Sequence, residues 1–239
     1  MNSLLVVKSF WFALVAAIIA VLLMMASFFL LEPTVGQAVN SQNFTIRQQI
    51  TDQISFTVEP SNVTMDGNIQ GLTGGNATGT TYAVVRTNSA GGYIMSIAFT
   101  NNGTPNAMLG ETTASESIRD YASTTAPAST EPDLLFWAST SAMFAYTVGS
   151  TTDGSSPSDL DDSFKDNGST CNQGAGSFTF NRCWKTPTVA GYQIVNRGSS
   201  APDGATTTIQ FKVHVPNTPN PSLDSDWYTA TATLTATNQ

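Results

Sequence analysis

"YTATATLTATNQ", residues 228–239, decides the fold class of this chain, because apolar and polar side chains alternate along it from Tyr228 to Thr237. One face would carry Tyr228, Leu234 and three alanines, and the opposite face would carry only threonine. A period of two is typical of a β-strand that buries one of its faces. The stretch therefore predicts a half-buried strand and points to an all-β protein.

The same alternation occurs upstream in "TIQFKVHV", residues 208–215, where the apolar residues would face inward and Gln210, Lys212 and His214 outward. Because the proline-rich connection 216–221 breaks the pattern, we predict that these two strands form a hairpin. We predict a second hairpin around residues 89–91. The other predicted strands are 46–58, 81–88, 92–100, 143–148 and 192–196. Isoleucines recur every fourth residue near the start of the first of these, so a short helix over 46–53 is the alternative there.

The composition agrees with a β-rich domain that has an unusual surface. Charged residues make up 11% of the chain, against about 25% in typical soluble proteins, and the polar residues are led by 34 Thr and 25 Ser. Threonine is β-branched and suits a pleated sheet. We predict one antiparallel β-sandwich, immunoglobulin-like or similar, over residues 39–239, with irregular insertions at about 101–134 and 149–187.

Residues 10–31 form an apolar run that only Ser27 interrupts, which is long enough to cross a bilayer as a helix. Two alternatives stay open for residues 1–38. The first is a signal peptide cleaved after Ala38, since Gly36 and Ala38 give the small-x-small pattern of a cleavage site. The second is a retained membrane anchor, which the length of the run favours. Both place residues 39–239 outside the cytoplasm.

The two cysteines, Cys171 and Cys183, lie in one polar stretch. Outside the cytoplasm thiols oxidise, and an even number of cysteines at short separation predicts a disulfide bond. A zinc site is the weaker hypothesis, because one histidine and two cysteines do not supply four ligands. We therefore expect the pair to pin a long surface loop in an oxidising compartment.

The acidic stretch around residues 153–166 offers oxygen ligands of the kind that calcium prefers. The candidate ligands are Asp159, Asp161, Asp162 and Asp166. Their spacing lacks the regularity of a dedicated calcium loop, and Lys165 lies among them. A solvated acidic loop without a metal is the favoured hypothesis, and calcium is the alternative.

Aromatic side chains are the candidates for contact with a ligand or partner. They are Trp137, Trp184, Trp227 and Tyr228. A tryptophan beside a disulfide or at a strand end more often packs against the core. We expect Trp184 to shield the adjacent cysteine bridge.

Charge and motifs argue against two classes of function. The net charge is −8 and the nine basic residues are scattered, which argues against binding to nucleic acid. A single histidine gives no obvious catalytic triad, and the sequence contains neither G-x-S-x-G nor H-E-x-x-H. We expect a protein that is not an enzyme.

Several segments, taken in order, resemble a group of predicted exported proteins found in small-celled bacteria of the candidate phyla radiation. They are "ISFTVEPSNVTMDGNIQGLTGG" (54–75), "TNSAGGYIMSIAF" (87–99), "RDYAS" (119–123), "FKDNGSTCNQ" (164–173), "RCW" (182–184), "IVNRGSSAPDGATTTIQFKV" (194–213) and the terminal "YTATATLTATNQ". The resemblance covers nearly the whole chain after the apolar run. It implies an exported, surface-associated β-sandwich, and it implies no catalytic residue.

Taken together, the sequence predicts an exported cell-surface structural or interaction protein that assembles with other copies by strand pairing. The expected partners are other copies or cell-envelope components, and the membrane through residues 10–31 if that segment is retained. A carbohydrate- or calcium-dependent binding module is the alternative, and a hydrolase is a weaker one.

Overall fold

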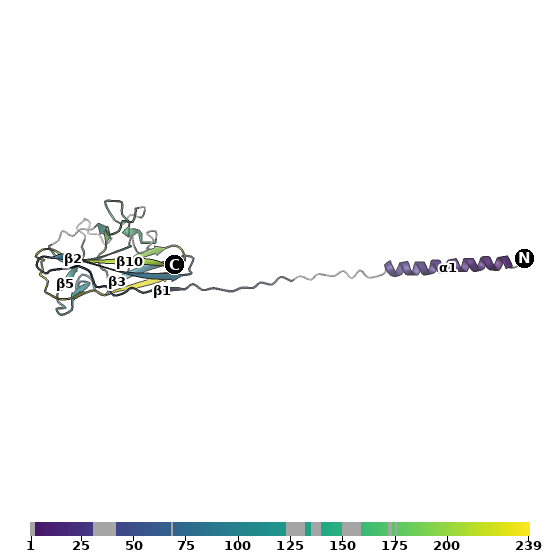
Figure 1. The fold of residues 1–239 in the computed structure, drawn as a ribbon, viewed down its shortest axis with the longest axis horizontal. Helices are drawn as coiled ribbons and strands as arrows, with labels where there is room; N and C mark the ends of the chain where they lie inside the picture. The colour runs from purple at the N-terminus through teal and green to yellow at the C-terminus, as the bar shows by residue number, and fades with distance from the viewer. Residues whose placement is uncertain are drawn as a thin grey trace. The chain divides into compact units, whose positions relative to one another are not determined.

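The computed structural model describes residues 3–30, 42–67, 69–122, 132–134, 140–149, 159–171, 174 and 176–239. The chain divides into two compact units, residues 1–49 and 50–239 (Figure 1). Among the described residues, one α-helix, α1 (Ser3–Leu30), belongs to the first unit, and the strands belong to the second.

Helix α1 contains residues 10–30 of the predicted apolar run. Its described side chains from Phe10 to Phe28 are exposed, and this window has a mean hydropathy of 2.5. A helix needs about 20 apolar residues to cross the hydrocarbon core of a membrane. By length and composition α1 is therefore suited to span a membrane, as both a signal peptide and an anchor would be.

The largest sheet in the described part of the chain has the strand order β1-β2-β10-β7-β5-β4-β11. In that order the strands are Ile54–Val58, Gly75–Thr87, Ala201–Val215, Met143–Val148, Ser117–Asp120, Met108–Gly110 and Tyr228–Thr229. Neighbouring strands are antiparallel except β5 and β7, which are parallel. The longest pairing joins β2 to β10, from Ala201 opposite Thr87 to Val215 opposite Gly75.

The second sheet has three antiparallel strands in the order β12-β3-β9, which are Ala232–Asn238, Tyr93–Phe99 and Tyr192–Arg197. A two-stranded sheet joins β6 (Asp133–Leu134) to β8 (Cys183–Trp184), and a 3₁₀ helix, η1, covers Asp162–Phe164. The two larger sheets are curled. The structure therefore establishes a mostly β domain, while the immunoglobulin-like sandwich stays a prediction.

Apolar side chains from both larger sheets meet in one core. Phe99 of β3 makes aromatic contacts with Phe144 and Tyr146 of β7, with ring centroids 5.9 and 5.4 Å apart. Strand β7 is buried along its whole length, and Met143 and Ala145 on its other face pack with Tyr121 and Trp184 in a second, smaller cluster. Such two-sided burial explains why the run "MFAYTV" is nearly free of polar residues.

Both predicted hairpins are wrong. Strand β10 pairs with β2 and β7, whereas the C-terminal stretch pairs with β4 through β11 and with β3 through β12. Residues 88–92 likewise carry the chain from β2 in one sheet to β3 in the other. Gly92 permits this crossing: its φ is +80°, and a Cβ there would lie 2.6 Å from the backbone nitrogen of Ser199.

Two further expectations need correction. The strand predicted over 46–58 forms only at Ile54–Val58, and the described residues before it are in neither a strand nor a helix. The stretches expected to be irregular contain short strands: β4, β5 and β6 in the first, and β8 with η1 in the second. Each of these elements has only two to four residues, too few to show a period.

Candidate functional site

The two cysteines form the predicted bond, since their sulfur atoms lie 2.09 Å apart and their Cα atoms 5.9 Å apart. Both are part of the main core: Cys183 in β8 is 1% exposed and Cys171 is 7% exposed. The hydroxyl of Thr147 in β7 donates a hydrogen bond to the carbonyl oxygen of Cys183, 2.6 Å away. The bond thus ties the loop before residue 171 to the centre of the domain, and not only to the surface.

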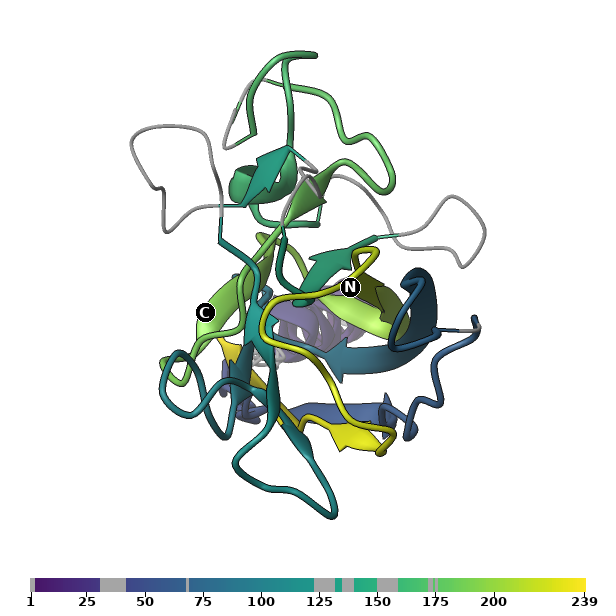
Figure 2. The same ribbon diagram turned by 90° about the vertical axis from the view of Figure 1, so that its left-hand side faces the viewer.

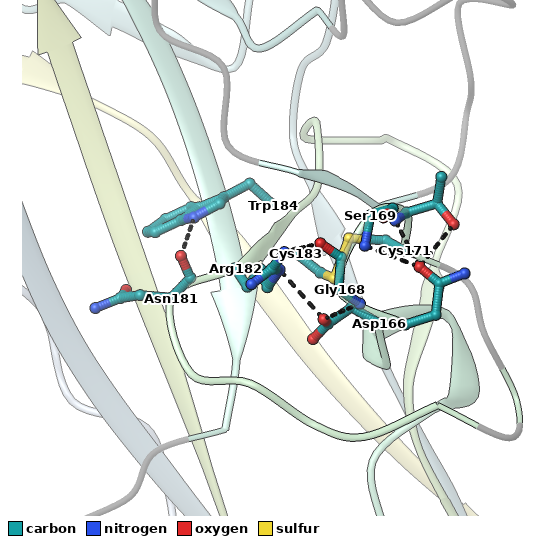
Figure 3. A network of polar contacts seen from close by, with 10 residues as sticks. Asp166, Gly168, Ser169, Cys171, Asn181, Arg182, Cys183 and Trp184 are labelled. Atoms are coloured by element: carbon teal, nitrogen blue, oxygen red, sulfur yellow. Dashed lines mark hydrogen bonds and ion pairs between the residues drawn. A yellow bond between two sulfur atoms is a disulfide. The ribbon is translucent and has the colours of Figure 1, made fainter.

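Figure 3 shows the polar network around this disulfide, in which Asp166 is central. Its carboxylate accepts a hydrogen bond from the backbone N–H of Gly168 (2.9 Å) and forms an ion pair with Nε of Arg182 (3.2 Å). The guanidinium of Arg182 also donates to the carbonyl oxygen of Gly168. Asp166 is 4% exposed, and a buried carboxylate needs such partners. This network organises the loop that carries Cys171.

The other three candidate calcium ligands also have protein partners. Asp159 forms an ion pair with Arg197, and Asp162 forms one with Lys165. Asp161 caps η1 by accepting from the backbone N–H of Ser163, 3.0 Å away.

Within the part of the chain that the structure describes, no three His, Cys, Asp or Glu residues lie close enough together to hold a metal ion. The expectation of a solvated acidic loop is wrong for Asp166, which is buried, and calcium binding stays a prediction.

The aromatic candidates do not form one surface. Trp184 is 1% exposed, and its indole N–H donates to the carbonyl oxygen of Asn181, 3.1 Å away. A side chain buried to this extent cannot contact a partner, so that candidate role for Trp184 is wrong. Trp184 packs with Tyr121 in the smaller cluster, on one face of β7. Cys183 belongs to the main core on the other face of β7. Trp137 lies outside the described residues.

Among the described members of the set, Trp227 is the exposed one, at 72%, and it lies in an open hollow with Thr112, Ser225 and Asp226. Burial alone would raise the pKa of Asp226, but hydrogen bonds from the backbone N–H groups of Thr113, Thr112 and Trp227 outweigh it and lower that pKa. The carboxylate of Asp226 is therefore held ionised beside the indole ring.

Tyr228, the neighbour of Trp227, is partly buried and serves the structure. Its hydroxyl donates to Glu116, 2.8 Å away. Burial first, and then the hydrogen bond to Glu116, raise the pKa of Tyr228. The pKa of Glu116 is lowered by hydrogen bonds from the backbone of Asp224 and from Tyr228.

The three-stranded sheet has two edges, and they differ. The edge at β9 is covered by residues 159–161: Leu160 bridges Val195, the N–H of Asp161 donates to Ile194 O (3.0 Å), and the N–H of Asn196 donates to Asp159 O (2.9 Å). These residues belong to the loop that the disulfide holds. Figure 2 shows the green loops of this region together at the top of the view.

The edge at β12 is open: among the described residues, its backbone pairs only with β3. The hydrogen bonds at the two ends of the ladder, Thr231 O with Thr100 N–H and Gln239 N–H with Gly92 O, show that odd-numbered residues face β3. Because the pattern alternates, the N–H and C=O groups of Ala232, Leu234, Ala236 and Asn238 point away from β3. These groups form a template on which another strand can pair.

An apolar seam runs beside this open edge. Strand β1, at the edge of the larger sheet, lies near β12 (Figure 1). Ile54 and Phe56 of β1, and Leu234 and Ala236 of β12, are only partly buried where they pack against the core. The seam therefore combines unpaired backbone groups with incompletely covered apolar side chains.

Sequence reasoning anticipated part of this site. The alternation in residues 228–239 predicted a half-buried strand, and β12 forms over Ala232–Asn238 within that stretch. The sequence did not indicate that residues 159–161 cover the other edge, since three residues are too short a signal. Neither the known protein families nor the curated proteins include a match to this chain.

Proposed function

We propose that this chain is an exported, non-enzymatic protein of the cell surface, folded as a β-sandwich, which assembles with other copies by strand pairing. The observation that carries the proposal is the difference between the two edges of the three-stranded sheet. One edge is covered by residues 159–161, while the other, β12, presents four residues with outward-facing backbone groups.

Strand β12 also lacks the features that usually prevent edge-to-edge pairing. Such features are lysine, proline, a β-bulge or very short length. The sequence of β12, "ATLTATN", contains no lysine and no proline, and its pairing with β3 is regular over seven residues. Edge strand β1, in contrast, has an irregularity between Phe56 and Val58. The edge at β9 is covered and the edge at β1 is irregular, whereas the edge at β12 is neither covered nor irregular. This difference supports a role for β12 in assembly.

The case for export rests on α1 and on the disulfide. A helix with this hydropathy at the N-terminus acts as a signal peptide or as an anchor, and a disulfide within the core is stable in an oxidising compartment. The low content of charged residues and the threonine-rich outer face of β12 suit contacts between like surfaces, because few charges would have to be desolvated.

A single substitution tests the strand-pairing proposal. Ala236→Pro removes an N–H that points to the open edge, and it leaves the hydrogen bonds to β3 in place. The matched control is Ala236→Ser, which keeps the N–H. We expect wild type and Ala236→Ser to form oligomers and Ala236→Pro to stay monomeric, measured by light scattering on the full chain purified from exporting cells.

Melting temperatures of the three proteins check that the fold is retained. Assembly of Ala236→Pro at wild-type concentrations would contradict pairing through β12. A wild-type protein that stays monomeric at every concentration would overturn self-assembly altogether.

A second candidate function, glycan binding, is favoured by Trp227. Exposed aromatic rings stack on sugar rings, and the neighbouring hydroxyls of Thr112 and Ser225 are suitable hydrogen-bond partners. Thermal shift across a glycan panel tests this candidate. A stabilisation that Trp227→Ala abolishes would favour it, and no shift with any glycan would count against it.

A further inference from the structure

Residues 42–50, just before β1, are exposed and form neither a helix nor a strand. Three large apolar side chains among them lie in the open: Phe44 is 82% exposed, Ile46 83% and Ile50 82%. Each would contribute substantially to stability if it were buried. Apolar residues this exposed and this closely spaced indicate a surface that contacts another molecule.

The pattern of this segment is that of a strand. Phe44, Ile46 and Ile50 share one parity with Ile54 and Phe56 of β1, and Gln48 and Asp52 are the polar members of the same face. Polar residues, among them Arg47 and Gln49, hold the opposite parity. The alternation that predicted a strand from residue 46 is thus real, but among the described residues of a single chain it is residues 54–58 that pair with a neighbouring strand.

The open edge of β12 matches this segment in length and character. Strand β12 has seven residues and the segment has nine. A strand added at this edge would extend the sheet and place one of its faces toward the seam, beside Leu234 and Ala236. Because the seam is apolar and incompletely covered, the face with Phe44, Ile46 and Ile50 is the one that fits.

The sequence before β1 offers no turn that would fold residues 42–50 back onto their own chain. The N–H of Gln53 donates to the side-chain oxygen of Asn88 (2.6 Å), and the side-chain amide of Asn88 donates to Thr51 O (3.1 Å). These bonds hold Thr51 and Gln53 beside Asn88, which follows β2. No glycine or proline stands between Gly36 and Pro60 to form such a turn.

We infer that residues 42–50 of one copy add as a strand to the open edge of β12 in a second copy, with Phe44, Ile46 and Ile50 covering Leu234 and Ala236. This inference rests on the proposed function and identifies the segment that supplies the pairing strand. Each copy has one donor segment and one acceptor edge, so the contact is head-to-tail and generates a chain of copies or a closed ring.

Cross-linking tests the contact directly. Two differently tagged full-length chains are co-expressed in exporting cells, one with Ile46→Cys and the other with Ala236→Cys. A disulfide-linked product that carries both tags is expected. The control is Arg47→Cys with the same partner, because residue 47 has the opposite parity and should cross-link much less. Equal cross-linking of the two variants, or none for Ile46→Cys, would overturn the inference.

A second test separates this inference from the proposed function. The double variant Ile46→Asn/Ile50→Asn changes two exposed side chains, so the fold of the single chain should be unaffected. We expect assembly weakened on the order of 100-fold or more, from the lost burial of two isoleucines. The control Arg47→Asn/Gln49→Asn, of opposite parity, should assemble as wild type does.

The results are unambiguous when read with Ala236→Pro. If Ala236→Pro prevents assembly while the double isoleucine variant assembles normally, strand pairing stands and the donor segment is wrong. If wild type itself never assembles, both proposals fall. Loss of assembly in Ala236→Pro and in the double isoleucine variant, with the controls intact, supports both.

Discussion

Replacing Cys171 and Cys183 together with alanine should destabilise the domain by about 3 kcal/mol. The two residues are separated by 12 positions, and the chain-entropy model gives about 2.8 kcal/mol for a closed loop of that size. Both sulfur atoms lie in the core, so the lost packing adds to this value. For a domain of about 190 residues, 3 kcal/mol corresponds to a fall of roughly 6–12 °C in the melting temperature.

Urea unfolding followed by tryptophan fluorescence measures this change, because the buried Trp184 follows Cys183 directly in the chain. Adding reductant to the double variant should change nothing, which controls for other effects of the reagent. A loss below about 1 kcal/mol, at an unchanged m-value, would refute the reasoning. The network around Asp166 would then hold the loop without the covalent bond.

Two further predictions concern the fold. Gly92→Ala should destabilise the domain by several kcal/mol, because the added Cβ would collide with the carbonyl of Arg197. The control Gly198→Ala should be near neutral, because a Cβ at that position meets nothing within 4 Å. Equal melting temperatures of the two variants would contradict this prediction. Burial and the nearby Lys212 lower the pKa of His214, so the folded domain favours the neutral imidazole. The contribution of His214 to stability is therefore full above about pH 6.5, and it is lost as the pH falls through the lowered pKa. His214→Gln should therefore lose less stability than wild type between pH 8 and pH 5 in urea titrations, and parallel losses would disprove the role of His214.

Strands with a buried face could be predicted from the sequence, since the alternation of apolar residues is local information. Strand β7 was predicted with its observed bounds, and β9 with one residue missing. The partners of the strands could not be predicted in the same way. Residues 216–221 have the composition of a hairpin connection, but they carry the chain away from β10 toward β4 and β3. Pairing depends on which surfaces are still uncovered when the whole domain packs, and no local pattern records that.

The candidate site shows the same limit. The disulfide could be predicted, because the chain has two cysteines and its apolar N-terminal run predicts an oxidising compartment. The aspartates could not be assigned, because a cap, an ion pair and a metal ligand all use the same residue type. Asp161 caps a 3₁₀ helix and Asp166 joins a buried ion pair, and both roles depend on residues that fold beside them. Burial of Trp184 depends equally on β7, about 40 residues away in the sequence.

The disulfide and the open edge act on the same sheet. Residues 159–161 cover β9, and the chain continues from them through η1 and Asp166 to Cys171, which the disulfide fixes to β8. A covalent bond thus holds the cover on one edge, while the opposite edge, β12, has no cover among the described residues. If both edges were open, copies could pair in several registers and form branched aggregates. One covered edge and one open edge leave a single acceptor on this sheet, as ordered head-to-tail assembly requires.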